Sequence, residues 1–201
     1  MPGEPRIATL GFLVLILTAC TVLPAGTAPI IRIGLVAPFE GRQREIGYDL
    51  IYAARLCVRQ WNGRGGVENY RVELVALDDG GDPERARRAA QSLGIDPAVV
   101  GVMGHWLAET TAAARPAYAQ VGLPLIPVDK STAWPGRLPE SFAAEYQAIS
   151  PLGDKPGPYA PQAYHACNRL VEAIGQAIAA EGQATRAGVA AALLSSQRQG
   201  E

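Results

Sequence analysis

The chain has 201 residues, of which 48% are hydrophobic, so it is long enough to bury the core of one ordinary globular domain. Its 18 basic and 19 acidic residues leave a formal net charge of −1. Because these charges are scattered along the chain, no basic stripe is available to neutralise a phosphate backbone, which argues against nucleic acid as a partner.

The amino-terminal residues predict an export signal. After Arg6, the segment Ile7 to Leu17 is an apolar run with the length of a signal-peptide core, too short to span a membrane. It ends in Leu17-Thr18-Ala19-Cys20, which resembles the lipobox of bacterial lipoproteins, whose cysteine receives a diacylglycerol. The resemblance implies a signal peptide over 1–19, a lipid anchor on Cys20, a tether over 20–29 and an exported protein on the periplasmic or extracellular face of the bacterial membrane. The alternative is an ordinary secretory signal with a chance cysteine.

Short β-rich runs then alternate with helical patterns. Strands are predicted at 30–37, 71–77, 99–103 and 123–128, and helices at 45–62, from Asp82-Pro83 onward, and at 109–121. At Asp82-Pro83 the aspartate is expected to cap a helix whose first position is proline. Strict alternation of strand and helix predicts an α/β fold over 30–134, with a doubly wound parallel sheet covered on both faces.

The alternation of predicted strands and helices ends after Ser131. Pro135 to Pro139 are typical of a linker, and the rest of the chain predicts helices at 142–148, 162–181 and 185–194. The segment 162–181 is amphipathic, and nothing else in the sequence would cover its apolar face. We therefore expect residues 135–201 to form a helical segment that packs on the same lobe.

Cysteine usage fits an exported protein without requiring a disulfide. If Cys20 is lipidated, Cys57 and Cys167 remain, both inside helical patterns and far apart in sequence. Whether they pair is left open by the sequence. Buried free thiols are the favoured interpretation, because a free cysteine behaves as a small hydrophobe.

Several motifs in order resemble one known family. These are Ile33-Gly34-Leu35-Val36-Ala37-Pro38, Asn62 with Gly65-Gly66-Val67, Val72 to Val75 with Asp78-Asp79 and Asp82-Pro83, Val100 to His105, Gly122 to Ile126, and the late helices around Tyr146, Tyr164-His165-Ala166 and Leu170. They are similar to the type I periplasmic solute-binding proteins of branched-chain amino-acid ABC transporters, the leucine-binding-protein-like family. The resemblance implies the periplasmic-binding-protein-like I fold, with the carboxyl-terminal helices on the first lobe.

The middle of the chain departs from that family. A second α/β lobe usually lies between the two matching regions, and here the sequence passes from Trp134 to Phe142 without room for one. One self-contained lobe could remain, because late helices of the family return to the first lobe. A shortened gene model or a remnant gene would give the same sequence.

The resemblance also places candidate ligand-binding residues in three loops at the carboxyl ends of strands, where open α/β sheets bind ligands. The candidates are Phe39 and Gly41 in the first loop, His105, Trp106, Thr110 and Thr111 in the second, and Asp129 and Ser131 in the third. Five of them have a structural alternative: the two threonines could cap a helix, Trp106 could pack in the core or at a lobe interface, His105 could hold a structural hydrogen bond, and Asp129 could be a solvated loop residue.

No motif indicates an enzyme. The chain lacks a Gly-x-Ser-x-Gly elbow, a P-loop and a dinucleotide fingerprint, and it shows no metal-ligand spacing, so neither cofactor nor metal is expected. The resemblance implies a membrane-anchored substrate-binding component of an ABC importer, with an amino acid or similar small polar solute and the ABC permease as partners. The alternative is a non-transporting remnant or protein-interaction module with the same fold.

Overall fold

The fold is built on a parallel sheet of four strands. The computed structural model describes residues 28–128 and 137–199, including the strands β1 (Ile30–Ala37), β2 (Arg71–Asp78), β3 (Val99–Gly104) and β4 (Leu125–Ile126). All neighbouring strands run parallel, in the order β2-β1-β3-β4. The predicted doubly wound α/β sheet is confirmed, with β4 much shorter than the 123–128 segment that the sequence favoured.

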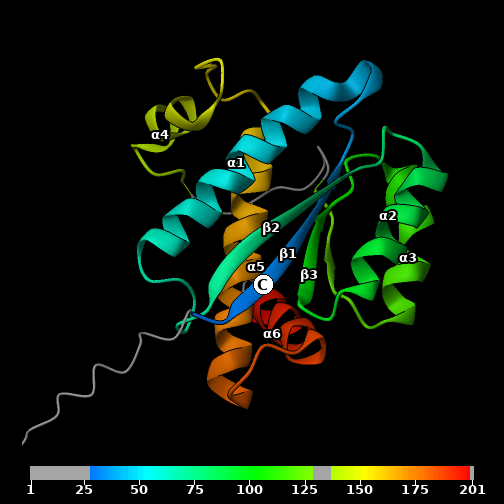
Figure 1. The fold of residues 1–201 in the computed structure, drawn as a ribbon, viewed down its shortest axis with the longest axis vertical. Helices are drawn as coiled ribbons and strands as arrows, with labels where there is room; N and C mark the ends of the chain where they lie inside the picture. The colour runs from blue at the N-terminus through cyan, green and yellow to red at the C-terminus, as the bar shows by residue number, and fades with distance from the viewer. Residues whose placement is uncertain (1–27, 129–136, 200–201) are drawn as a thin grey trace, which may run out of the picture.

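Helices cover both faces of this sheet (Figure 1). One face carries α2 (Pro83–Ile95) and α3 (Ala108–Gln120), and the other carries α1 (Arg44–Gly63), α5 (Ala160–Glu181) and α6 (Arg186–Gln199). A short 3₁₀ turn (Gly41–Gln43) precedes α1, and α4 (Phe142–Ile149) packs against α1. The strands are buried from both sides, which explains their nearly continuous apolar sequences.

Side-chain alternation divides the core between the two layers. On β1, Ile33 and Leu35 point into the larger core under α1 and α5, whereas Val36 points into the smaller core under α2 and α3. All three side chains are fully buried. The period of two along the strand therefore supplies both cores at once.

The start of α2 follows the predicted pattern. The Asp82 carboxylate accepts the N–H of Arg85 at 2.8 Å, and Pro83 occupies the first helical position, where a missing N–H costs nothing. At the other end of the chain, α5 stops at Gly182, whose φ of +75° is the left-handed conformation that favours glycine.

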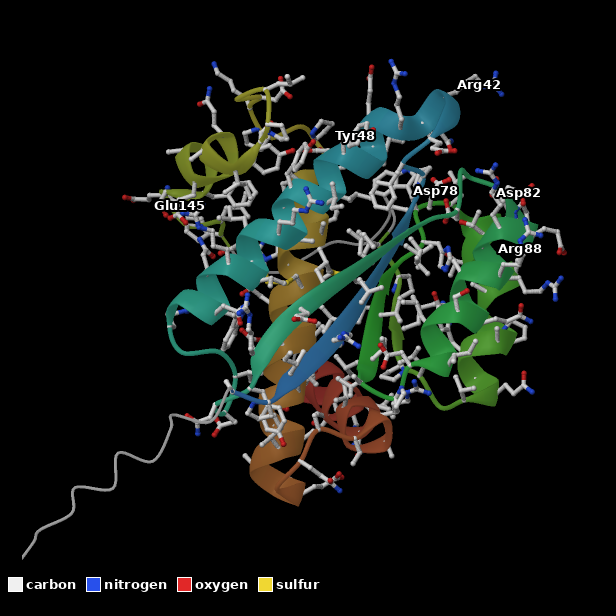
Figure 2. The ribbon with its side chains drawn as sticks, viewed as in Figure 1. Arg42, Tyr48, Asp78, Asp82, Arg88 and Glu145 are labelled. Carbon is white, nitrogen blue, oxygen red and sulfur yellow. A yellow bond between two sulfur atoms is a disulfide. The ribbon has the colours of Figure 1, made fainter. Side chains whose placement is uncertain are left out.

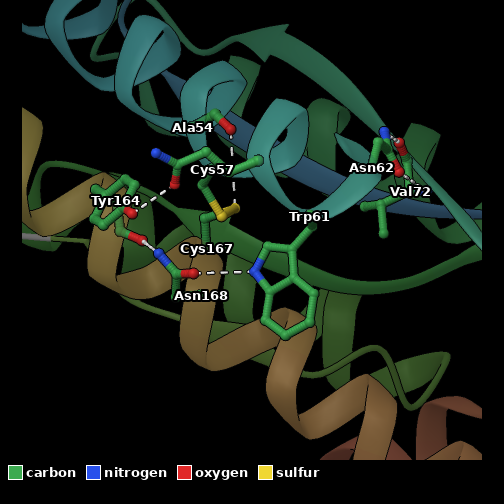
Figure 3. Close-up of a disulfide and its surroundings, with 9 residues drawn as sticks. Ala54, Cys57, Trp61, Asn62, Val72, Tyr164, Cys167 and Asn168 are labelled. Atoms are coloured by element: carbon green, nitrogen blue, oxygen red, sulfur yellow. Dashed lines mark hydrogen bonds between the residues drawn. A yellow bond between two sulfur atoms is a disulfide. The ribbon is translucent and has the colours of Figure 1, made fainter. Parts of the chain in front are cut away.

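A disulfide joins α1 to α5, which corrects the expectation of free thiols. Cys57 and Cys167, 110 residues apart, are bonded and completely buried (Figure 3). The two helices pack closely enough side by side to bring the Cα atoms within 6.3 Å. Sequence patterns within either helix carry no information on this pairing, because they report only which face of each helix is buried.

The last helix is attached to the amino-terminal edge of the sheet through one arginine. The Arg186 guanidinium donates to the carbonyl oxygens of Gly94, Asp96, Val99 and Val121 at 2.8–3.2 Å. These carbonyls lie at the end of α2, at the start of β3 and at the end of α3. A single side chain of α6 therefore binds three segments of the chain. No helix within the described residues is long and apolar enough to cross a membrane.

Candidate ligand-binding surface

The loops that follow β1, β2 and β3 meet at the carboxyl edge of the sheet, as parallel strands require. Figure 2 shows Arg42, Asp78, Asp82 and Arg88 gathered at this end of the molecule, where α1 and α2 begin. Predicted ligand-binding residues of the first two candidate loops are therefore brought to one edge. Asp129 and Ser131 of the third loop lie outside the described residues, as does Cys20.

Asp78 holds the first loop in place. Its Oδ1 accepts the N–H groups of Phe39 at 2.7 Å, Gly80 at 3.0 Å and Glu40 at 3.2 Å, and its Oδ2 accepts a hydrogen bond from Arg85 at 3.1 Å. One carboxylate thus satisfies backbone donors from two loops, which fixes the loop after β1 against the loop after β2. The sequence placed an acidic pair here without assigning it this role.

Asp79 and His105 form a fully buried polar pair behind the surface. His105 Nδ1 lies 2.8 Å from Asp79 Oδ2, and His105 Nε2 lies 3.2 Å from the Tyr118 hydroxyl. Burial, together with the negative charge of Asp79, raises the pKa of Tyr118, which therefore stays protonated. Both ring nitrogens of His105 have protein partners, so the structure supports the hydrogen-bonding alternative and leaves neither nitrogen for a solute.

The two threonines at the start of α3 also direct their hydroxyls inward. Thr110 Oγ1 donates to the Leu107 carbonyl at 2.9 Å, and Thr111 Oγ1 donates to the carbonyls of Leu107 at 2.9 Å and His105 at 3.3 Å. Both residues are buried. Leu107 is the N-cap residue and provides no side-chain cap, so the threonines do not cap N–H groups of the helix as the structural alternative supposed.

Trp106 packs against the segment that leads into α5. Its ring meets that of Tyr159 edge to face, with centroids 4.5 Å apart, and only 6% of the residue is exposed. The structure therefore places Trp106 in the core, as the packing alternative proposed. Phe39 is only partly buried and Gly41 is exposed with a φ of +78°, so these two reach the surface.

Asp49, which the sequence analysis did not single out, accepts four hydrogen bonds through its carboxylate, as many as Asp78 does. It lies on α1 and accepts the N–H groups of Gly157 at 2.9 Å, Tyr159 at 2.8 Å and Ala160 at 2.8 Å, together with the Tyr146 hydroxyl at 2.9 Å. Burial, and then the Asp49 charge, raise the pKa of Tyr146. Asp49 falls among the apolar positions of α1, and a charged residue at such a position indicates a buried carboxylate with hydrogen-bond partners.

The described residues contain no group of three or more histidine, cysteine, aspartate or glutamate side chains that could hold a metal ion. What the carboxyl edge offers is a surface of backbone groups and of the Phe39 side chain, supported from behind by the Asp78 and Asp79 networks. Such a surface can bind a small solute through hydrogen bonds.

Residues 30–139 match the family described as periplasmic binding protein. An amino acid binding protein of Pseudomonas aeruginosa is 25% identical over 113 residues, and the Leu/Ile/Val-binding protein of Escherichia coli is 27% identical over 119 residues. These alignments cover 56% and 59% of this chain but only 30% of each relative. The chain therefore spans less than a third of the proteins it resembles in sequence.

One solved structure resembles the chain over most of both lengths. A crystal structure from Rhodospirillum rubrum, described as a branched-chain amino acid ABC transporter, superimposes with a TM-score of 0.69 over 82% of this chain and 88% of its own. At 15% identity this likeness shows the fold alone.

Proposed function

Because the chain belongs to the periplasmic binding protein family, we propose that it is a substrate-binding protein of an ABC importer that binds an amino acid or a similar small polar solute. Its relatives are amino-acid-binding proteins, and a non-enzymatic role follows from the family. We further propose an ABC permease as its transport partner and a lipid on Cys20 as its membrane anchor. The observation that carries the proposal is the family match over 30–139, which includes the first two candidate loops.

We place the solute against the loop of Phe39 and Gly41 and against the loop that starts α3, with Asp129 and Ser131 as further contacts. Trp106, Thr110, Thr111 and His105 then support the site from behind, because they are buried. The first backbone N–H groups of α3, which have no partner within the helix itself, and the helix dipole favour a carboxylate at this position.

The affinity expected of one lobe is low. A two-lobed binding protein encloses 70–90% or more of a small ligand, whereas a single sheet edge contacts it from one side. Hydrogen bonds at an open surface contribute about 0.5–1.5 kcal/mol each, and three or four of them must also offset the cost of immobilising the solute. We therefore expect a dissociation constant of about a millimolar or weaker.

Titration with a panel of amino acids, followed by NMR of the backbone amides, tests this proposal. At least one amino acid should produce saturable shifts confined to the loops at 39–43 and 105–111. Gly41→Ala should weaken the binding, because its φ of +78° disfavours a side chain. Glu68 is exposed in the turn between α1 and β2, away from these loops. The control variant Glu68→Gln should leave solute binding unchanged. If no panel member gives saturable shifts at these loops, the proposal is wrong.

A second candidate function is favoured by the burial of the candidate side chains His105, Trp106, Thr110 and Thr111. A non-transporting protein-interaction module would keep the fold and use the same edge to bind a protein. The genomic neighbourhood distinguishes the two. Adjacent permease and ATPase genes support transport, and their absence supports the interaction module.

A further inference from the structure

The outer side of α1 carries a row of arginine and tyrosine side chains. Its members recur at intervals of three or four residues, which places them on one face of the helix. They are Arg44, Tyr48, Tyr52, Arg55 and Arg59, which we call the α1 stripe. Tyr52 is half-buried and the other four side chains are exposed, with Tyr48 47% exposed. The buried residues of α1 fall on the rest of its circumference, so the stripe belongs to the surface of the molecule.

The two tyrosine rings of the stripe are held in order by neighbouring side chains. Tyr48 and Tyr52 stack with their centroids 6.3 Å apart and their planes 13° from parallel. The Arg55 guanidinium carbon lies 5.9 Å from the centroid of the Tyr52 ring, and the buried Tyr146 of α4 meets the same ring edge to face. Figure 2 shows Tyr48 near the start of α1. An ordered pair of amphipathic rings at the surface suits a boundary between water and an apolar phase.

The three arginines of the stripe keep their charge available. Within residues 28–128 and 137–199, the side chains of Arg44, Arg55 and Arg59 form neither a hydrogen bond nor an ion pair. By contrast, Arg32 and Arg87 are paired with carboxylates at 2.7–3.2 Å. The guanidinium groups of the stripe are therefore free to bind an anion from outside the chain.

Two carboxylates border the stripe without neutralising it. Glu45 is exposed in the first turn of α1. Glu145 of α4 lies near Arg59, but its carboxylate accepts hydrogen bonds from Gln60, at 2.8 Å, and from Ser141 instead. Three guanidinium groups against two carboxylates leave the stripe with an excess of positive charge.

The described chain begins at the end of the molecule where α1 stops. The Asn62 side chain, in the last turn of α1, binds the start of β2 (Figure 3), where the Arg71 N–H donates to the Pro29 carbonyl at 2.8 Å. Residue 28 follows Cys20 by eight positions, and a chain spans at most about 3.6 Å per residue. A lipid on Cys20 would therefore hold residue 28 within about 29 Å of a bilayer. That reach is similar to the length of α1, about 30 Å for its 20 residues.

We propose that the α1 stripe binds the surface of a bilayer that contains anionic lipids. This inference rests on the lipid anchor proposed at Cys20, which keeps a bilayer within reach of the helix. Arginine stems can lie along the apolar boundary while their guanidinium groups bind lipid phosphates, and tyrosine rings favour the same level of the bilayer. An acidic protein would match the charges as well, but the bilayer is the anionic surface that the anchor holds beside the helix.

Bilayer contact through α1 sets the orientation of the lobe. α1 covers one face of the sheet and α2 and α3 cover the other, so α2 and α3 point away from the bilayer (Figure 1). The loops at the carboxyl ends of the strands then lie at the side of the molecule, open to water. Solute binding and bilayer contact are thus expected to use separate surfaces.

A fluorescent probe tests this contact in the exported full chain, purified in detergent and reconstituted into vesicles. Cys57 and Cys167 are bonded and buried, and Cys20 would carry the lipid, so a polarity-sensitive fluorophore reacts with an introduced cysteine. On Tyr48→Cys, its emission should shift to shorter wavelength in vesicles containing phosphatidylglycerol and not in vesicles of phosphatidylcholine alone. On Ala119→Cys, at an exposed position of α3, the emission should shift in neither.

Charge reversal tests whether the arginines cause the contact. Arg55→Glu combined with Arg59→Glu should lower the equilibrium constant for bilayer contact roughly tenfold or more, measured as loss of the shift at the position-48 probe. Arg88→Glu combined with Arg115→Glu is the matched control, because it reverses two exposed arginines of α2 and α3 and should leave the shift unchanged. A chain that floats with anionic vesicles while its position-48 probe stays unshifted overturns the proposal, as does a shift that survives reversal of Arg55 and Arg59. A chain that floats with neither kind of vesicle lacks the anchor, and the proposed orientation is then wrong as well.

Discussion

Asp49 shows how one side chain can organise a junction of helices. Its carboxylate accepts three backbone N–H groups at and before the start of α5, and these are donors that the helix itself cannot satisfy. It also accepts the Tyr146 hydroxyl from α4. The residue is 7% exposed, so its bonds are largely shielded from water. Removing the carboxylate would leave several buried donors without partners.

We therefore predict that Asp49→Ala lowers the free energy of unfolding by about 3 kcal/mol, because hydrogen bonds to charged groups contribute about 1.5–3 kcal/mol and the donors here share one acceptor. Tyr146→Phe is the matched comparison, which removes one donor and keeps the ring, and should cost about 1 kcal/mol. Urea unfolding followed by circular dichroism measures both. Equal stability of Asp49→Ala and the unaltered chain would contradict this role.

Cys20 carries the proposed anchor. Its place after Leu17-Thr18-Ala19, at the end of the apolar run, predicts that the unaltered chain incorporates radiolabelled palmitate in a bacterial host and that Cys20→Ser does not. Ala19→Ser, which keeps a small residue before the cysteine, should still be labelled. Equal labelling of the unaltered chain and Cys20→Ser would show that the lipid is attached elsewhere.

At the scale of elements, the disulfide between α1 and α5 closes a long loop. Since 110 residues separate Cys57 from Cys167, the bond restricts the unfolded chain strongly, and loss of such a bond typically costs about 2–5 kcal/mol. We expect Cys57→Ala with Cys167→Ala to be less stable by this amount.

Denaturant titration with and without a reductant measures the effect. A reductant should destabilise the unaltered chain, once unfolding exposes the buried bond, and should leave the double variant unchanged. A double variant as stable as the oxidised chain would show that packing of α1 on α5 is sufficient by itself.

Most elements could be predicted from local pattern. The strand at 30–37 has the predicted bounds, and the helices at 45–62 and 162–181 differ from α1 and α5 by one or two residues at their ends. In each case the period of apolar residues matches one buried face or a strand buried on both sides. The strand at 123–128 was too long, because only Leu125 and Ile126 pair with β3.

The candidate site was less predictable. The predicted parallel strands imply that the first two candidate loops lie at one edge of the sheet, and the structure has them there. Local sequence does not indicate whether a side chain in such a loop points to solvent or into the core. His105 turns inward because Asp79 and Tyr118 bind both ring nitrogens, and Trp106 turns inward because Tyr159 covers it. The Asp49 contacts and the disulfide join residues about a hundred positions apart, which no period within a single helix encodes.

At the scale of the molecule, we propose that the carboxyl-terminal helices and the amino-terminal sheet form one domain. Residues of α5 such as Ala163, Leu170 and Ile174 are buried in the core beneath α1. The fit against β3 is close, since a Cβ on Gly101 would lie 2.5 Å from Leu170 Cδ1. The sheet face on this side has no other cover among the described helices than α1, α5 and α6.

A fragment ending at Gly157 should accordingly aggregate, because loss of α5 and α6 exposes a continuous apolar face. A chain ending at Gln183 keeps α5 and the disulfide, and should retain more soluble protein. Solubility and the sharpness of the unfolding transition are the measurements. A soluble 20–157 fragment that unfolds cooperatively would show that the sheet and α1 are a complete domain.

Arg186 has a consequence for the order in which the chain can fold. Its four carbonyl partners lie at 94–121, and the helix that carries it is the last element of the described chain. The attachment of α6 to the sheet layer therefore depends on contacts between distant parts of the sequence, and contacts of this kind form slowly. In the export that the amino-terminal sequence predicts, that delay would be useful, because a polypeptide must remain unfolded while it passes through a translocation pore. The late closure would keep the nascent protein competent for export until its carboxyl-terminal helices have crossed.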